Sequence, residues 1–249
     1  MFSCKFLLPL LLCSLFFLLV PPASNSHLLK DCKFEAIYQP GDSISDTGNN
    51  IIENPSTTCA RLPYGQNFYR KAAGRCSNGL LMIDYIALSA GLPLLDAYLN
   101  PNSTTGHGVN FAVAGSTALP TDCSKKLEKS LLMVGEIGGN DYNYGLFEGK
   151  TIDELKSIRS DVIKSIKRII GNGATRIVFP GNLPIVCLPA FLTEFHTNNA
   201  TAYDEFHCLK ELNNLSMYHN EHLQKAIEEV KKEHSNMTIM YGDYYNSYI

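Results

Sequence analysis

A serine placed directly behind a glycine turn is the residue of this sequence best suited to chemistry. The tetrad Gly41-Asp42-Ser43-Ile44 follows a short apolar segment, Phe34–Tyr38, that is typical of a β-strand. A strand that runs into such a turn can present a hydroxyl at the carboxyl end of a sheet, where nucleophiles of α/β enzymes lie. Gly-Asp-Ser is also common turn chemistry, so Ser43 taken alone fits a turn or N-cap serine equally well.

Two more segments with suitable residue types follow in the chain. The run 108–116 is a short apolar segment that ends in Gly115, and Gly138-Gly139-Asn140-Asp141 follows the apolar run Leu131–Ile137. Gly115 has no side chain to keep its backbone N–H away from a ligand, and the amide of Asn140 donates hydrogen bonds without carrying charge. Each segment also has an ordinary explanation, because a glycine lets a turn pass and a Gly-Gly-Asn loop can simply follow a strand.

Taken together and in this order, the three motifs resemble those of the GDSL esterase/lipase family, also called the SGNH hydrolases. Further stretches resemble the plant branch of that family: Pro63-Tyr-Gly-Gln-Asn-Phe68, Gly74-Arg-Cys-Ser-Asn-Gly79, Gly135-Glu-Ile-Gly-Gly-Asn-Asp141 and Tyr241-Gly-Asp-Tyr-Tyr-Asn246. The resemblance covers essentially all of the chain behind its N-terminal segment. Within the plant branch it leans toward the subgroup that includes acetylajmalan esterase, an alkaloid acetyl-ester hydrolase.

The resemblance implies a fold, a reaction and a set of roles. The fold is a three-layer α/β sandwich with a parallel, flavodoxin-like sheet of about five strands. The reaction is hydrolysis of carboxylic esters, either small acyl esters or lipids, without a cofactor or a metal. Ser43 matches the nucleophile, and its backbone N–H, that of Gly115 and the side-chain amide of Asn140 match the three donors of an oxyanion hole.

Serine hydrolysis also needs a base that takes the hydroxyl proton and a group that orients this base. The family supplies both from an Asp-x-x-His behind its last strand, and no such pair follows the predicted strand Thr238–Tyr241. Asp204-Glu-Phe-His207 has the spacing but precedes the second long helix, so we do not expect His207 to act. His219 lies on the apolar stripe of that helix and is expected to be a packed core residue. The sequence therefore indicates a C-terminally truncated hydrolase that lacks the catalytic His and its Asp.

A second departure lies in the middle of the chain. Ser116–Cys123 leads almost directly to the predicted strand at Leu131, where members of the family carry a longer, largely helical stretch. We interpret this as an internal deletion, and Cys123 is expected to have lost its disulfide partner with the deleted stretch.

The N-terminus and the net charge indicate the compartment and exclude some partners. Phe6–Val20 is an apolar run behind Lys5 that is typical of a signal peptide, with small residues at Ser24 and Ser26. We therefore expect a signal peptide at 1–26, one hydrolase domain at 27–249, and a secreted monomer in the extracellular space, cell wall or vacuole. The net charge is −3 with no basic run, which argues against nucleic acid and anionic membranes as partners. The apolar run is short for a membrane span, so no stable membrane anchor is expected.

Cysteines and sequons agree with a secretory route. No Cys-x-x-Cys or Cys/His cluster suggests a metal, so disulfides are the expected fate of the cysteines. The pairing favoured is Cys187 with Cys208, which would close the irregular segment between them. Four asparagines lie in sequons that proline does not block and are candidate glycosylation sites: Asn102, Asn199, Asn214 and Asn236.

Alternating apolar runs and amphipathic segments predict an α/β domain with a parallel sheet. Strands are predicted at Phe34–Tyr38, Val109–Val113, Leu131–Ile137, Arg176–Pro180 and Thr238–Tyr241. Helices are predicted near Gly79–Ala90, from a Thr151/Glu154 capping box to Gly171, and at Lys210–Glu233.

Two functions of different class remain open at this point. The first is a secreted GDSL-type serine esterase or lipase. The second is a catalytically impaired pseudoenzyme or a non-catalytic secreted glycoprotein, since a serine without a base is a poor nucleophile near neutral pH.

Overall fold

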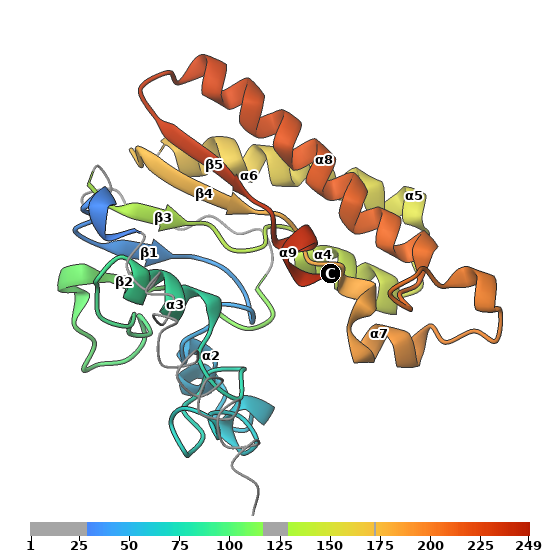
Figure 1. Ribbon diagram of the computed structural model, residues 1–249, viewed down its shortest axis with the longest axis horizontal. Coiled ribbons are helices and arrows are strands. Elements are labelled where there is room, and N and C mark those ends of the chain that lie inside the picture. The colour runs from blue at the N-terminus through green and yellow to red at the C-terminus, as the bar shows by residue number, and fades with distance from the viewer. Residues whose placement is uncertain (1–28, 117–128, 172) are drawn as a thin grey trace, which may run out of the picture.

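The computed structural model describes residues 29–116, 129–171 and 173–249 (Figure 1). The expected signal peptide and Cys123 lie outside these residues. Within the described part, five parallel strands form one sheet in the order β2-β1-β3-β4-β5. They are β1 (Ile37–Gln39), β2 (Gly108–Asn110), β3 (Leu131–Met133), β4 (Arg176–Pro180) and β5 (Thr238–Gly242). This order is the flavodoxin-like one, so the predicted fold class and topology are confirmed.

Strand β1 is the centre of the N-terminal half of the sheet. Its residue Ile37 is opposite Gly108 of β2 on one side and opposite Leu131 of β3 on the other. Gly108 has φ +104°, and a side chain there would collide with the Ile37 carbonyl. Only glycine therefore allows β2 to approach β1 this closely.

Helices cover both faces of the sheet, which gives three layers (Figure 1). The described helices are α2 (Asn49–Glu53), α3 (Met82–Ser89), α4 (Gly139–Phe147), α5 (Ile152–Leu155), α6 (Arg159–Gly171), α7 (Pro189–Glu194), α8 (Lys210–Glu233) and α9 (Tyr244–Tyr248). Apolar side chains of α6 and α8, among them Ile166 and Ile227, pack on one face of the sheet. Ile83 and Ala87 of α3 pack on the other face against Ile37. None of the described helices is long and apolar enough to cross a bilayer.

Two predicted elements differ from the structure in extent. The long helix expected from Thr151 is interrupted by a 3-10 turn at Lys156–Ile158, between α5 and α6. The hydroxyl of Ser157 donates to the Glu154 carbonyl at 2.7 Å, and such local side-chain bonds compete with the helical ladder. The capping box is present, since Thr151 N donates to Glu154 Oε2 at 2.8 Å. Strands β2 and β3 end three and four residues before the predicted Val113 and Ile137, because the chain turns into loops there, whereas β1 begins later than predicted, at Ile37.

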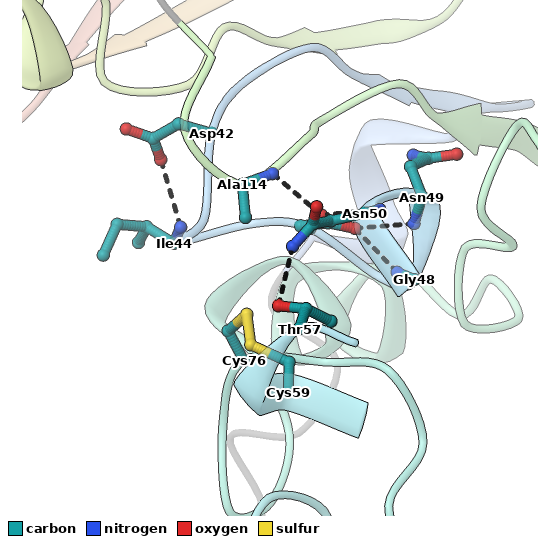
Figure 2. Close-up of a disulfide and its surroundings, with 10 residues drawn as sticks. Asp42, Ile44, Gly48, Asn49, Asn50, Thr57, Cys59, Cys76 and Ala114 are labelled. Carbon is teal, nitrogen blue, oxygen red and sulfur yellow. Dashed lines mark hydrogen bonds between the residues drawn. A yellow bond between two sulfur atoms is a disulfide. The ribbon is translucent and has the colours of Figure 1, made fainter. Parts of the chain in front are cut away.

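Two disulfides stabilise segments outside the sheet. One joins Cys187 to Cys208, which links the turn before α7 to the start of α8. The other joins Cys59 to Cys76 (Figure 2), a pair that the sequence did not single out. Cys32 is an exposed free thiol in the described part of the chain.

Candidate active site

The turn that carries Ser43 lies at the carboxyl end of β1, the strand from which the sheet winds in both directions. Such a switch point is where open α/β sheets form their binding crevices. Asp42 Oδ1 accepts a hydrogen bond from Ile44 N at 3.0 Å, and this bond holds the turn around Ser43 (Figure 2). Ser43 is partly buried. Its hydroxyl makes no hydrogen bond to any residue in the described ranges, so none of these residues acts as a base for it.

Gly115 lies in the loop that follows β2. It has φ +90°, a conformation that favours glycine, and a side chain at this position would approach the Tyr144 hydroxyl to 3.0 Å. That hydroxyl donates to the Gly115 carbonyl at 3.1 Å. Helix α4, which carries Tyr144, therefore holds this loop from the side of β3.

Asn140 lies in the first turn of α4 and is 9% exposed. Its Nδ2 donates to the Ser116 carbonyl at 2.7 Å and, in a longer bond of 3.3 Å, to Asp42 Oδ2. Ser116 follows Gly115, and Asp42 precedes Ser43. The structure thus brings the three loops singled out from the sequence to one place, with the Asn140 amide at their junction.

Asp46 fastens the loops after β1 and β2 to each other. It is fully buried, and its carboxylate accepts from the backbone N–H groups of Gly48, Asn49 and Asn50 at the start of α2. The same carboxylate accepts from Ala114 N at 2.9 Å (Figure 2). Sequence reasoning missed this residue, although an Asp before Thr-Gly-Asn-Asn is a typical N-cap or Asx-turn signal.

Two carboxyl groups lie near Asn140, and burial dominates the pKa of each. Asp42 is 5% exposed, and burial raises its pKa to about 6 against the opposing hydrogen bond from Ile44 N. Burial, and then the charge of Asp42, raises the pKa of Glu136 to about 8. Glu136 Oε1 accepts from Leu183 N at 3.1 Å in the loop after β4. This contact ties the segment before α4 to the loop after β4.

No described histidine exchanges a hydrogen bond with Ser43. His207 is exposed in a turn, and the carboxylate of its neighbour Asp204 accepts from the backbone N–H of Phe206 and Cys208. The Asp-x-x-His spacing at 204–207 therefore builds a local Asx turn beside the disulfide and not a His–Asp couple.

His219 is a core residue of α8. It is 1% exposed, and its Nδ1 lies 3.1 Å from the Tyr142 hydroxyl of α4. Burial lowers the pKa of His219 to about 4, so its imidazole is neutral near neutral pH. A side chain at Gly138 would come within 3.5 Å of the His219 ring. His219 therefore packs against the loop that precedes Asn140.

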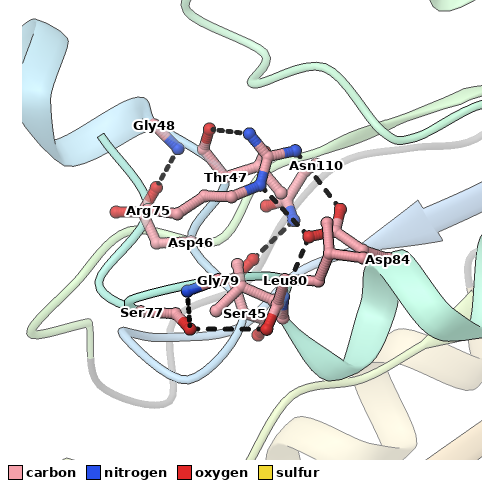
Figure 3. A network of polar contacts seen from close by, with 11 residues as sticks. Ser45, Asp46, Thr47, Gly48, Arg75, Ser77, Gly79, Leu80, Asp84 and Asn110 are labelled. Carbon is pink, nitrogen blue, oxygen red and sulfur yellow. Dashed lines mark hydrogen bonds and ion pairs between the residues drawn. The ribbon is translucent and has the colours of Figure 1, made fainter. Parts of the chain in front are cut away.

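A buried ion pair between Arg75 and Asp84 lies beside the segment that follows Ser43 (Figure 3). The guanidinium of Arg75 binds both carboxylate oxygens of Asp84 at 3.2 Å and donates to the Thr47 carbonyl at 3.4 Å. Nearby, Asn110 Nδ2 donates to the Ser45 carbonyl at 2.6 Å. The segment 45–47, which follows the candidate nucleophile, is thus held by polar contacts from two directions.

Comparison with known proteins identifies the family of this chain. Residues 40–249 match the family model described as GDSL-like Lipase/Acylhydrolase. The chain therefore belongs to the GDSL lipase/acylhydrolase family, whose members are carboxylic ester hydrolases.

Individual relatives are plant proteins. The chain is 38% identical over 260 residues to an acetylajmalan esterase of Rauvolfia serpentina, with 87% of this chain and 67% of the relative covered. It is 38% identical over 259 residues to the GDSL esterase/lipase At1g28570 of Arabidopsis thaliana, which covers 86% and 67% of the two chains. The GDSL esterase/lipase At5g45910 of the same plant is 36% identical over 264 residues, with 86% and 71% covered.

Proposed function

We propose that this chain is a secreted serine esterase of the GDSL type that acts on small acyl or acetyl esters, with Ser43 as its nucleophile. The observation that carries the proposal is the position of the Asn140 amide, which bonds the neighbours of both Ser43 and Gly115. Three donors are assigned to the developing oxyanion: the N–H groups of Ser43 and Gly115 and the Asn140 amide. An acetyl ester as substrate fits the name of the acetylajmalan esterase relative.

The bonding of Asn140 suggests how a substrate would enter this site. Both amide protons of Asn140 are engaged, one in a short bond to Ser116 O and one in a longer bond to Asp42. The bond to Asp42 is the longer and weaker of the two, so it is the one that a developing oxyanion replaces most readily. We infer that the substrate takes the place of Asp42 as the acceptor, while the bond to Ser116 keeps the amide in place.

The lack of a described base at Ser43 supports a second candidate, a catalytically impaired or non-catalytic secreted glycoprotein. The asparagines of the four sequons, Asn102, Asn199, Asn214 and Asn236, are all exposed, as glycosylation requires. In either case we assign 1–26 as a signal peptide, 27–249 as the hydrolase domain, and a monomeric state.

Hydrolysis of a nitrophenyl acetate by the purified protein separates the two candidates. An esterase shows turnover that disappears in Ser43→Ala. A rate equal to that of Ser43→Ala identifies the non-catalytic protein.

A further inference from the structure

Two successive carbonyl groups of the loop after β2 are bound by side chains of one helix. The Tyr144 hydroxyl donates to the Gly115 carbonyl at 3.1 Å, and Asn140 Nδ2 donates to the Ser116 carbonyl at 2.7 Å. Asn140 and Tyr144 are four residues apart in α4, so both project from the same side of the helix, one turn apart. One side of α4 therefore binds two neighbouring peptide groups of this loop.

The backbone N–H of Gly115 lies between peptide groups that are held on both sides. On its N-terminal side, Ala114 N donates to Asp46 Oδ2 at 2.9 Å (Figure 2). On its C-terminal side, the Tyr144 hydroxyl binds the Gly115 carbonyl. The Gly115 N–H itself donates to no acceptor in the described ranges. The surrounding contacts thus position this donor and leave it free to bind another molecule.

Gly115 depends on such contacts because its own conformation is weakly restrained. It is exposed and has φ +90°, and a residue without a side chain can leave such a conformation easily. Ser116 N donates to the Val113 carbonyl at 3.0 Å, which closes the turn but binds neither polar group of Gly115. Among the described residues, Tyr144 alone forms a hydrogen bond with Gly115.

We propose that Tyr144 is a positioning residue for the oxyanion hole, because its hydroxyl holds the Gly115 carbonyl and thereby fixes the direction of the Gly115 N–H. A donor that is already aligned before the reaction needs no reorganisation as charge develops, and this is what makes it effective. The role of the Gly115 N–H as an oxyanion donor rests on the proposed function. The effect of Tyr144 on the order of this N–H does not.

In this arrangement α4 serves two of the three assigned donors. It carries Asn140, whose amide is one donor, and through Tyr144 it positions the Gly115 N–H, which is another. The Tyr144 side chain is 49% exposed, so its hydroxyl exchanges one bond to water for one to the loop and adds little to the stability of the fold. Loss of the hydroxyl should therefore loosen Gly115 while the fold remains intact.

Nuclear magnetic resonance relaxation tests the proposal without any need for turnover. The ¹⁵N order parameter of the Gly115 N–H is measured in the wild type and in Tyr144→Phe, which keeps the ring and removes the hydroxyl. We expect about 0.85 in the wild type, as for rigid backbone, and a fall toward about 0.6 in Tyr144→Phe. The order parameter of Ala114 should not change, because its N–H binds Asp46.

Tyr85→Phe is the matched control. It removes the hydroxyl of an exposed tyrosine in α3 and should leave the order of Gly115 unchanged. A Gly115 order parameter that is already low in the wild type, or that is equal in the wild type and Tyr144→Phe, would overturn the proposal.

Kinetics on a nitrophenyl acetate test whether this order matters to the reaction. We expect Tyr144→Phe to lower kcat about tenfold with little change in KM, because the interaction that it weakens strengthens only in the transition state. Tyr144→Leu should have the same effect, since the hydroxyl and not the ring positions Gly115. A loss confined to Tyr144→Leu, or a raised KM with unchanged kcat, would show that Tyr144 contacts the substrate instead. If the wild type is no faster than Ser43→Ala, the proposed function fails, and the order parameters still decide whether Tyr144 positions Gly115.

Discussion

The carboxylate of Asp46 accepts a hydrogen bond from Ala114 N at 2.9 Å, and this contact joins residues 68 positions apart in the chain. Asp46 also accepts from three N–H groups at the start of α2. One side chain therefore joins the loop after β1, which carries Ser43, to the loop after β2. The two loops that must stay aligned around a substrate therefore share Asp46 as a common anchor.

Replacement of Asp46 by alanine should strongly destabilise the fold. The change leaves four backbone donors without their acceptor in a fully buried place. We expect a loss of about 3 kcal/mol in the free energy of unfolding, measured by urea denaturation with an unchanged m-value. Asp46→Asn, which keeps one acceptor oxygen, is the matched control and should lose less. Equal stability of wild type and Asp46→Ala would show that these bonds contribute nothing net.

Removal of the Asn140 amide should lower esterase activity more than it lowers stability. Any turnover of a nitrophenyl acetate should fall by roughly 10²–10³-fold in Asn140→Ala, if the amide stabilises the transition state. Because no described base contacts Ser43, we expect the wild-type rate itself to be low, and Ser43→Ala should abolish it. His207→Ala serves as the control and should leave the rate unchanged. A loss of turnover in His207→Ala would identify an unforeseen base.

The pair of Arg75 and Asp84 should be more sensitive to loss of one partner than of both. The Asp84 side chain is fully buried and the Arg75 side chain is 10% exposed. We expect Arg75→Met to cost about 3–5 kcal/mol in the free energy of unfolding, because it strands a buried carboxylate. The double variant Arg75→Met/Asp84→Leu should recover part of this loss. A double variant that is less stable than Arg75→Met would contradict this view of the pair.

His219 should make the protein less stable in acid. Its folded-state pKa of about 4 lies below the ordinary value of 6.5, so its contribution is complete above pH 6.5 and is lost as the pH falls toward 4. The loss should approach about 3 kcal/mol, measured as the wild-type free energy of unfolding minus that of His219→Gln at each pH. The raised pKa values of Asp42 and Glu136 act in the opposite direction, and this subtraction removes them. A difference that is constant from pH 7 to 4 would refute the assignment.

The sequence predicts best those strands and helices whose residue pattern is regular over their whole length. Strand β4 and helix α8 have the predicted bounds, because a short apolar run defines the first and a 3.6-residue period extends along the second. The meeting of the loops at Ser43, Gly115 and Asn140 follows from the parallel order of the strands, which brings their carboxyl ends to one edge.

What the sequence did not predict depends on single contacts between distant residues. The bond from Ala114 to Asp46 has no periodic signal, and neither has the bond from Asn140 to the Ser116 carbonyl. Cys59 and Cys76 are 17 positions apart, a spacing that does not distinguish this pair from other choices. The break at Lys156–Ile158 coincides with a bond from the Ser157 hydroxyl to the Glu154 carbonyl, which an apolar pattern does not register.

The position of each strand in the sheet has a consequence for local opening. Strand β1, which leads to Ser43, is paired along both edges, whereas β2, which leads to Gly115, has only the bridge from Ala97 to Asn110 on its outer side in the described part of the chain. Backbone amides of a doubly paired strand exchange with solvent only in large unfolding events, and those of an edge strand exchange in smaller ones. We therefore expect the backbone amides on the Gly115 side of the site to exchange with solvent faster than those of β1 on the serine side.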